Sequence, residues 1–552
     1  MNIMAGMDQA GRFLSSGRIY AALVLVAACL LAGCSLAAMA ERQAGDAEET
    51  KRAEETVDVE RTANADAPDR PNIIMILTDD LDAGSISHMP NLRTLLIERG
   101  TTFENAFVTD PLCCPSRATI LRGQYAHNHE ILGNEPPHGG FERFRAMGHQ
   151  SSTMATWIQS EDYRTSLVGK YMNGYEGTHV PPGWDEWYAV SGNYMSTDLN
   201  ENGRIVSYDP ERDHLDDVLA DRATGYVGRP GGGAPSFFVP HRPFFMWVGT
   251  TAPHQPADPA PRHADAFANV SLPRPPSFDE SDVSDKPDWI RDNPPLNPEQ
   301  ISLAEDLHRK RLQSMLAVDD MIGQLVDALR ESGELDETYL VFTSDNGFHL
   351  GTHRLTAGKW TAYEEDIRVP LIVRGPGVPE GRKLEHLVLN NDLAPTFADL
   401  AGAGVPSFVD GRSLEPLLTD NPPPADSWRQ AFLVEAMAES AEVPPSVDDE
   451  SLIPLLTGDT QPPEDTRRSS PLDEAPLKDA GRPALVAVRT QDRLYVEYES
   501  GESELYDLER DPYQLNNVYE DTGLKHLWRL EGWLDALRDC VGEECRAAED
   551  GR

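Results

Sequence analysis

Basic residues are scarce in this chain relative to acidic ones. Its 552 residues include 48 lysines and arginines against 92 aspartates and glutamates, which gives a net charge of −44 at pH 7. Such a surface repels a phosphate backbone, so the composition excludes nucleic-acid binding through a general basic surface. The few cations near a functional site therefore matter more than usual for any chemistry on an anion.

Cysteine is also rare, and its six residues fall into three pairs along the chain. Two lie in the N-terminal leader, two are adjacent at Cys113 and Cys114, and two lie near the C-terminus at Cys540 and Cys545. The last pair is close enough to close a small loop, and an exported chain can oxidise it. A free pair or a metal-binding pair is the alternative. Because no histidine cluster is near these two in the sequence, we expect the disulfide.

A long apolar run of the kind that spans a membrane is missing as well. Arg12 and Arg18 precede a short, alanine-rich apolar run at residues 19–31, which is typical of an export signal. The run ends in Leu-Ala-Gly-Cys, which resembles the bacterial lipobox and implies a lipid on Cys34. The alternative is an ordinary signal cleaved near residues 38–40. We expect export from a bacterial cell and a lipid-anchored envelope protein, otherwise a secreted or periplasmic one.

The rest of the chain divides by composition, and its length allows more than one domain. A stretch rich in Ala, Glu and Asp follows the leader, and a Pro- and acid-rich stretch interrupts the second half. We predict a signal peptide, an acidic tether, a catalytic domain, a linker or insertion, and a small C-terminal domain, at residues 1–33, 34–70, 71–421, 422–483 and 484–552.

Cys113 begins the stretch that carries the most chemistry. Pro115 suits the first turn of a helix, where free backbone N–H groups favour an anion. Arg117 follows Cys113 by about one helical turn, so its guanidinium can lie beside the reacting group. These residues predict an anion-handling nucleophile at a helix N-terminus, with a thiolate or a derivative of the cysteine as the attacking group. A buried inert pair or a Cys113–Cys114 disulfide is the alternative.

Polar residues follow several short apolar runs that we predict as buried parallel strands. Asp79 and Asp80 follow residues 73–78, and Asp345 and Asn346 follow residues 338–343. Open α/β sheets bind ligands at the carboxyl ends of such strands. An all-oxygen set of this kind suits a hard cation such as Ca²⁺, whereas a solvated turn is the alternative at the first two positions.

Further candidate residues arrive at the same edge. Lys170 ends the predicted strand at residues 165–171, and His254 follows another at residues 242–250. Lys359 lies in a short Ala-Gly-Lys-Trp segment. His349 and His353 lie near the second acidic pair, so a mixed nitrogen and oxygen site stays open.

The remaining pattern predicts helices between these strands and a smaller sheet at the end. Helical spacing of apolar residues is clearest at residues 301–330, with Gly333 as a stop. We interpret residues 259–298 as a long surface loop. We also expect helices at 90–99, 390–400 and 524–537, and strands at 101–107, 369–373, 485–489, 493–499 and 504–507.

Together these motifs resemble the sulfatase family over residues 71–545. The likeness lies in Leu-Cys-Cys-Pro-Ser-Arg, Gln-Tyr-Ala-His-Asn-His, Gly-Lys-Tyr, Ala-Pro-His, Thr-Ser-Asp-Asn-Gly and Asp-Ile-Arg-Val-Pro-Leu. It is strongest to the branch of N-acetylglucosamine-6-sulfatases and heparan endosulfatases. The resemblance implies an α/β fold like that of alkaline phosphatase, with a mixed sheet sandwiched by helices and a smaller C-terminal α+β domain.

The resemblance also implies the site and the reaction. The family's first signature cysteine, here Cys113, is oxidised to formylglycine (3-oxoalanine) by a formylglycine-generating enzyme, and its hydrate attacks sulfur. The second hydroxyl then expels sulfate. Residues matching the family's Ca²⁺ ligands are Asp79, Asp80, Asp345, Asn346 and the modified Cys113. Residues matching those that handle the formylglycine and the sulfate are Arg117, Lys170, His254 and Lys359, with His254 as proton donor to the leaving alcohol.

Two positions depart from the family pattern. Many arylsulfatases have a histidine two residues after the lysine of the Gly-Lys motif, where this chain has Met172. Trp360, next to Lys359, departs from the glucosamine-sulfatase pattern. The expected substrate is a sulfated sugar or an aryl sulfate. The alternatives are a phosphonate or phosphate ester hydrolase of the same superfamily, and a non-catalytic lipoprotein that binds sulfated glycans.

Overall fold

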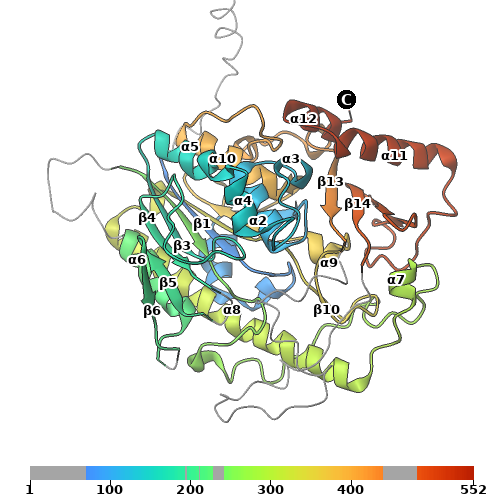
Figure 1. Ribbon diagram of the computed structural model, residues 1–552, viewed down its shortest axis with the longest axis horizontal. Coiled ribbons are helices and arrows are strands. Elements are labelled where there is room, and N and C mark those ends of the chain that lie inside the picture. The colour runs from blue at the N-terminus through green and yellow to red at the C-terminus, as the bar shows by residue number, and fades with distance from the viewer. Residues whose placement is uncertain (1–69, 193–195, 211, 228–241, 439–481, 552) are drawn as a thin grey trace, which may run out of the picture. The chain divides into compact units, whose positions relative to one another are not determined.

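A computed structural model describes residues 70–192, 196–210, 212–227, 242–438 and 482–551 (Figure 1). The predicted signal peptide, the lipid on Cys34 and almost all of the acidic tether lie outside these residues. So does most of the predicted linker at residues 422–483. Within the described part of the chain, no helix is both long and apolar enough to cross a membrane.

A ten-stranded mixed sheet forms the centre of the fold. Its strands lie in the order β12-β2-β11-β8-β1-β7-β3-β4-β5-β6. Their bounds, in that order, are Arg382–Leu389, Thr101–Phe107, Leu371–Arg374, Thr338–Ser344, Asn72–Thr78, Phe244–Gly249, Arg164–Gly169, Glu186–Val190, Asp198–Glu201 and Arg204–Ser207.

The middle of this sheet is parallel and buried. β8, β1, β7, β3 and β4 run parallel to one another, while β11 runs antiparallel to both β8 and β2. Every residue of β1, β7 and β8 is buried, as the continuous apolar runs predicted. Alternate residues of β1 contribute to two separate hydrophobic clusters, one on each face of the sheet.

Helices cover both faces of the sheet (Figure 1). α2, α5 and α10 contribute to one cluster, and α6 and α8 to the other. The bounds of the longer helices are Cys113–Arg122 for α2, Met154–Ser160 for α5, Leu215–Val227 for α6, Pro298–Ser332 for α8 and Leu393–Ala401 for α10. The sandwiched mixed sheet confirms the predicted fold class.

Shorter helical segments connect these elements. They are α3 (Ala126–His129), α4 (Gly140–Ala146), α7 (Asp288–Arg291) and α9 (Glu364–Ile367), with single turns at η1 (Ser85–His88), η3 (His149–Ser151), η4 (Pro261–His263), η5 (Leu335–Glu337), η6 (Asn390–Asp392), η7 (Glu415–Leu417) and η8 (Ala425–Ser427). The helix predicted at residues 90–99 is a short π-helical segment, η2 (Leu92–Ile97).

The long helix α8 has clear signals at both ends. Asn297 caps its start by accepting a hydrogen bond from the Gln300 backbone N–H, and Pro298 occupies the first turn. Gly333 ends it in the left-handed conformation at φ 78°, as predicted. Such capping fixes the register of the helix, and with it the side chains that α8 presents to the sheet.

A second, antiparallel sheet lies at the C-terminal end of the chain. It contains β13 (Ala431–Ala436), β14 (Leu485–Thr490), β15 (Arg493–Tyr498) and β16 (Ser503–Asp507), in that order. α11 (Leu524–Arg538) and α12 (Glu543–Glu549) complete this part. The strands predicted from alternation are confirmed, and so is the disulfide between Cys540 and Cys545.

The start of the predicted linker differs from the expectation. β13 lies within residues 422–483, pairs with β14 and is buried over most of its length. Its apolar run is short and is surrounded by proline and acidic residues, so composition averaged over the segment hid a strand. The predicted surface loop at residues 259–298 also contacts the C-terminal part of the chain. Lys286 Nζ donates to the carbonyl oxygens of Gln514 and Leu515 at 2.8 and 2.9 Å.

Candidate active site

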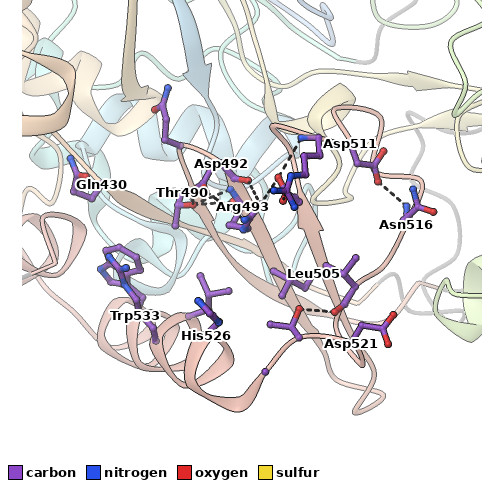
Figure 2. A pocket seen from close by; sticks show the side chains of 18 residues that line it. Gln430, Thr490, Asp492, Arg493, Leu505, Asp511, Asn516, Asp521, His526 and Trp533 are labelled. Atoms are coloured by element: carbon purple, nitrogen blue, oxygen red, sulfur yellow. Dashed lines mark hydrogen bonds and ion pairs between the residues drawn. The ribbon is translucent and has the colours of Figure 1, made fainter.

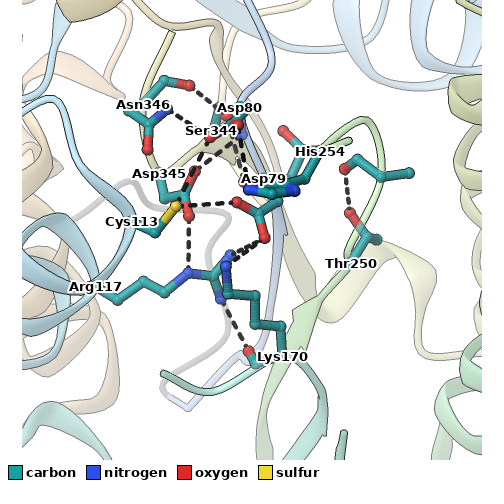
Figure 3. A network of polar contacts seen from close by, with 12 residues as sticks. Asp79, Asp80, Cys113, Arg117, Lys170, Thr250, His254, Ser344, Asp345 and Asn346 are labelled. Carbon is teal, nitrogen blue, oxygen red and sulfur yellow. Dashed lines mark hydrogen bonds and ion pairs between the residues drawn. The ribbon is translucent and has the colours of Figure 1, made fainter. Parts of the chain in front are cut away.

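The predicted site residues meet at the carboxyl edge of the parallel strands (Figure 3). β1 delivers Asp79 and Asp80, and its neighbour β8 delivers Asp345 and Asn346. On the other side of β1, β7 leads to His254, and β3 beyond it leads to Lys170. The order of the strands therefore brings together residues that are up to 267 positions apart, as the strand-end argument predicted.

A close approach of two backbones positions Lys170. Gly169 has φ 99°, and a Cβ atom there would lie 1.8 Å from the carbonyl oxygen of Gly249. Only glycine fits between β3 and β7 at this point. Lys170 Nζ lies 2.6 Å from Asp79 Oδ2.

Cys113 begins α2 and lies among the charged groups. Its Sγ is 3.4 Å from Asp79 Oδ1 and 3.8 Å from Asp80 Oδ1, and Lys359 Nζ approaches it to 2.7 Å. Neither Cys113 nor Cys114 forms a disulfide, so the alternative of a disulfide between them is excluded. Burial raises the pKa of the Cys113 thiol far above its ordinary value, although Lys170 and Lys359 oppose this. As an unmodified cysteine, this residue is a neutral thiol and a poor nucleophile.

Arg117 lies one helical turn into α2 and is fully buried. Its Nε donates to Asp345 Oδ2 at 2.8 Å, and its Nη1 donates to the carbonyl oxygen of Lys170 at 2.9 Å. Nη2 lies 3.7 Å from Asp79 Oδ2. The guanidinium thus links α2 to the ends of three strands. A planar group with five donors can do this, and an ammonium group cannot.

Lys359 comes from a small hairpin outside the main sheet. The hairpin pairs β9 (His349–Leu350) with β10 (Ala357–Gly358), and Lys359 follows directly. Its Nζ donates to Asp80 Oδ1 as well as approaching Cys113. Arg482, just before β14, donates to the carbonyl oxygen of Lys359 and stacks over the Trp360 ring at 4.8 Å. The C-terminal part of the chain therefore supports the lysine segment.

The oxygen ligands predicted for a cation lie together. The Asp80 backbone N–H donates to Asp345 Oδ1 at 3.1 Å, and Asn346 Nδ2 donates to Asp80 Oδ1 at 2.7 Å. Asn346 Oδ1 is buried and has no hydrogen-bond partner among the described residues. A buried amide oxygen without a donor is costly next to three carboxylates, and a bound cation would satisfy it. The residues present therefore fit a hard divalent cation.

The three carboxylates differ in their pKa. Burial raises the pKa of Asp79, but Lys170 and Arg117 outweigh it and hold the pKa well below its usual range. Lys359 and His254 likewise outweigh burial and lower the pKa of Asp80. Burial, together with the charge of Asp79, raises the pKa of Asp345 to about 6. All three are mainly ionised at neutral pH.

His254 faces Asp80 across the site. Its Nε2 lies 3.7 Å from Asp80 Oδ2, while its Nδ1 is 2.7 Å from the carbonyl oxygen of Gln255. Because a carbonyl only accepts, Nδ1 carries the hydrogen and Nε2 is the atom that faces the site. Burial lowers the pKa of His254 against the opposing charges of Asp80 and Asp79.

The other two histidines considered as ligands belong elsewhere. His349 Nδ1 bonds the Asp366 carboxylate at 2.9 Å, and His353 Nδ1 bonds Glu280 Oε2 at 2.6 Å. Neither of these carboxylates is among the predicted ligands. Of the three histidines, the only one whose ring is close enough to Asp79, Asp80 and Cys113 to share an ion with them, among the residues described, is His254.

Sequence reasoning missed one buried cation beside the site. Arg311 lies in the middle of α8, is 3% exposed and contacts the Asp80 and Pro253 carbonyl oxygens. It falls on the apolar stripe of the helix, between Leu307 and Val318. A charged residue at an apolar helical position was the signal that could have found it.

A wide groove in the C-terminal part contains none of the predicted site residues (Figure 2). It has a volume of about 870 Å³ and lies between the second sheet and α11. Some of its charged groups form ion pairs with one another, as Arg493 does with Asp507. The chemically distinctive cluster is therefore the one at the edge of the main sheet.

Comparison with known proteins identifies the family. The sulfatase family profile matches residues 71–403. The N-acetylglucosamine-6-sulfatase of Homo sapiens is 34% identical over 499 residues, which cover 86% of this chain and 86% of that protein. The extracellular sulfatase SULF-1 homolog of Drosophila melanogaster is 36% identical over 401 residues, covering 71% of this chain and 35% of that protein. The chain thus matches about a third of that relative, and about half of a similar Caenorhabditis elegans protein.

Solved structures agree with the fold. A protein in complex with its substrate D-glucosamine-2-N,6-O-disulfate superposes with a TM-score of 0.66 and 25% identity, covering 88% of this chain and 100% of that chain. The phosphonate monoester hydrolase of Silicibacter pomeroyi superposes with a TM-score of 0.56 and 23% identity, over 84% and 93% of the two chains. The second likeness concerns the fold alone. The family match, which covers more than half of the chain, shows that this protein belongs to the sulfatase family.

Proposed function

We propose that this protein hydrolyses sulfate esters, with a sulfated sugar as its substrate. The observation that carries the proposal is the meeting of three carboxylates, an amide oxygen and the cations Arg117, Lys170 and Lys359 around Cys113. A sulfate ester is an anion, and the net charge of −44 opposes its approach. Local cations at the reacting centre overcome that field at short range, where screening is weak.

The substrate class follows from the relatives rather than from the geometry. Relatives that match most of this chain are named N-acetylglucosamine-6-sulfatases, and the solved structure described above holds a 6-O-sulfated glucosamine. We therefore assign a sulfated amino sugar as the first substrate to test. An aryl sulfate serves as the general reporter of sulfate ester cleavage.

We assign Ca²⁺ to the oxygen ligands of this site. Asp79, Asp80, Asp345 and Asn346 would hold it, together with the modified side chain at position 113, and the buried Asn346 Oδ1 supports this assignment. When bound, the ion would draw electron density from the sulfate oxygens and stabilise charge that develops on them. The three carboxylates supply the negative charge that holds the ion at this site.

We also assign formylglycine to position 113. Its formation oxidises the side-chain carbon to an aldehyde with loss of sulfur, and requires an oxidant and the formylglycine-generating enzyme of the cell. The hydrated aldehyde supplies a hydroxyl nucleophile for sulfur and a second hydroxyl for release of sulfate. The neutral, buried thiol of Cys113 is consistent with a residue that needs conversion before it can attack.

The other residues have separate tasks in this proposal. Arg117, Lys170 and Lys359 place positive charge where the sulfate oxygens lie. His254 donates a proton from Nε2 to the alcohol oxygen as the bond between that oxygen and sulfur breaks. In the net reaction, ester and water give alcohol, sulfate and a proton. Burial lowers the pKa of His254, while the charges of Asp80 and Asp79 oppose this shift and favour the protonated form that a proton donor requires.

Export is part of the proposal as well. The leader at residues 1–33 and the lipobox-like Cys34 support a lipid-anchored envelope protein. The disulfide between Cys540 and Cys545 supports an oxidising compartment.

Tandem mass spectrometry of the tryptic peptide at residues 100–117, from protein made in its native host, tests the modification. We expect the mass loss of a thiol-to-aldehyde conversion at Cys113 and an unmodified Cys114. The same sample should release sulfate from a 6-O-sulfated glucosamine and from an aryl sulfate. Two unmodified thiols in a sample that still releases sulfate would exclude formylglycine.

Two matched variants test the role of position 113. Cys113→Ala removes the nucleophile and should lower sulfate release to the uncatalysed level, a loss of at least about 10⁵-fold. Cys114→Ala changes the neighbouring buried cysteine and should retain activity within about tenfold.

Faster cleavage of aryl phosphonate than aryl sulfate would favour the phosphonate hydrolase alternative. Glycan binding with no sulfate release by the modified protein would favour the binding lipoprotein.

A further inference from the structure

Arg311 contacts three segments that build the active site, although it comes from a helix on the face of the sheet. Its Nη2 donates to the carbonyl oxygen of Asp80, and its Nη1 donates to that of Pro253 at 3.2 Å. Its guanidinium carbon lies 4.1 Å from the centre of the Phe348 ring. These segments follow β1, β7 and β8, which supply Asp80, His254 and Asn346.

The Asp80 backbone needs such support. Its φ of 68° lies in the left-handed region, which is unfavourable for a residue other than glycine. Hydrogen bonds hold both sides of this residue. Its N–H donates to Asp345 Oδ1 at 3.1 Å, and its carbonyl accepts from Arg311. The unusual backbone turns the Asp80 carboxylate toward Cys113, so the contact with Arg311 bears directly on where that carboxylate lies.

The second carbonyl belongs to the residue before His254. The loop there is held to β1, because the Asp79 N–H donates to the Ala252 carbonyl at 3.1 Å and the Thr250 N–H donates to that of Leu77 at 3.0 Å. Arg311 adds a bond from outside the sheet to the same loop. One planar group with fixed donor spacing therefore connects the carbonyl of Asp80 to the carbonyl next to His254.

We propose that Arg311 is a positioning residue that sets the distance between the Asp80 carboxylate and the His254 imidazole. The Nε2 atom of His254 is 3.7 Å from Asp80 Oδ2, and both groups face the same reacting centre. This inference rests on the proposed function, because the pair matters for rate only if both groups act in one reaction. A misplacement of about 1 Å can lower a rate about 10²-fold.

Alternative explanations of Arg311 are weaker. Asp82 is 3.6 Å away and about a quarter exposed, so neutralising it does not require a buried arginine. A simple packing role would be met by a leucine or methionine on the apolar stripe of α8. The two carbonyl bonds are the features that an apolar residue cannot reproduce.

The test compares Arg311→Met, Arg311→Lys and a control, Arg309→Met. Arg309 lies on the same helix and pairs with Asp306 near the surface. For Arg311→Met we expect kcat for a sugar sulfate to fall about 30- to 300-fold, with KM changed less than about threefold. The loss should be smaller for a nitrophenyl sulfate, which needs less help from His254. The kcat of Arg311→Lys should lie between those of the wild type and Arg311→Met, since one ammonium group cannot bond both carbonyls in the same geometry. The kcat of Arg309→Met should stay within about twofold of the wild type.

Hydrogen exchange of the same variants gives a measurement that does not depend on turnover. In folded Arg311→Met, amides at residues 78–84 and 250–257 should exchange at least about tenfold faster than in the wild type, and those of β14–β16 should not change. Wild-type exchange in both segments would overturn the proposal, and so would equal rate losses for all leaving groups. If the wild type releases no sulfate but exchange rises in both segments, the proposed function fails while the positioning role stands. If Arg311→Met does not fold, Arg311→Lys decides by the same measurements.

Discussion

The site at the edge of the main sheet and the groove in the C-terminal part differ in the burial and pairing of their charged groups. In the first, carboxylates and cations are almost fully buried and converge on one sulfur atom, as with Asp79, Lys170 and Cys113. In the second, charged groups such as Arg510 are exposed, and their partners are beside them in the sequence or across one strand pair. The groove is a wide cavity, whereas the charged side chains of the site lie close together.

The difference shows why the size of a cavity does not locate chemistry in this protein. Burying charges costs free energy unless each is paired or a ligand compensates it. We attribute the many ionised groups of this buried cluster to the proposed reaction, whereas exposed pairs contribute little to stability and need no such reason. The predictions below test whether this contrast is real, from the largest effect to the smallest.

Removal of the proposed Ca²⁺ should lower the activity of the site and should leave the structure of the groove unchanged. Dialysis against a calcium chelator should lower sulfate release at least about 10³-fold, because three carboxylates and the buried Asn346 oxygen would lose the charge that balances them. Added Ca²⁺ should restore the rate more fully than Mg²⁺, which demands a smaller octahedral site. Hydrogen exchange of β14–β16 should not change. Full activity in protein shown by elemental analysis to be free of calcium would contradict the assignment.

His254→Ala should lower the kcat for a sulfate ester by an amount that depends on its leaving group. A sugar alkoxide needs a proton as it departs, so its sulfate should be cleaved about 10²- to 10³-fold more slowly. A nitrophenolate leaves without one, so its sulfate should lose less than about tenfold. The comparison uses kcat for both esters on the same preparation. Equal losses for the two would instead assign His254 to binding.

The strand ends explain why so much of this site could be predicted. Continuous apolar runs such as β1 and β8 are visible in a sequence, and parallel strands bring the residues after them to one edge. Asp79, Asp80, Asp345 and Asn346 therefore came together as expected. Cys113 and Arg117 required only helical spacing. Lys359 follows a two-residue strand, so its place rested on the family resemblance alone.

What could not be predicted depends on contacts between distant elements. Arg311 lies at an apolar position of the helical pattern, but its contacts with Asp80 and Pro253 form only when the helix packs on the sheet. β13 is separated from its partner β14 by a long stretch of chain, and its six residues alone do not indicate a sheet. β6 is short and exposed, with no apolar pattern to mark it. In each case the deciding interaction is with a residue far away in the sequence.

His127 offers a test of stability away from the chemistry. Its Nδ1 is 2.9 Å from Glu435 Oε1, and its Nε2 is 3.0 Å from the carbonyl oxygen of Cys540. Both nitrogens face acceptors, so the ring is protonated. Burial lowers the pKa of His127, but these partners outweigh it and raise the pKa to about 9. The folded state therefore binds this proton more tightly than the unfolded chain does, where the pKa is about 6.5.

The stabilisation from His127 should be fully present below pH 6.5 and should disappear as the pH rises through 9. In denaturant titrations, the difference in unfolding free energy between the wild type and His127→Gln should shrink by about 1–3 kcal/mol between pH 6 and pH 9.5. A constant difference for His127→Gln would mean that its ring is neutral in the folded protein.

The smallest effect is expected in the groove itself. His526→Ala and Arg510→Ala remove exposed side chains, and surface changes of this kind alter stability by about 0.5 kcal/mol or less. Their kcat/KM on a sulfated monosaccharide should stay within about twofold of the wild type. The decisive comparison repeats the assay with a sulfated polymer, which is long enough to reach beyond the site. A tenfold loss on the polymer alone would mean that the groove binds substrate, and the contrast between a reactive site and an inert groove would then be wrong.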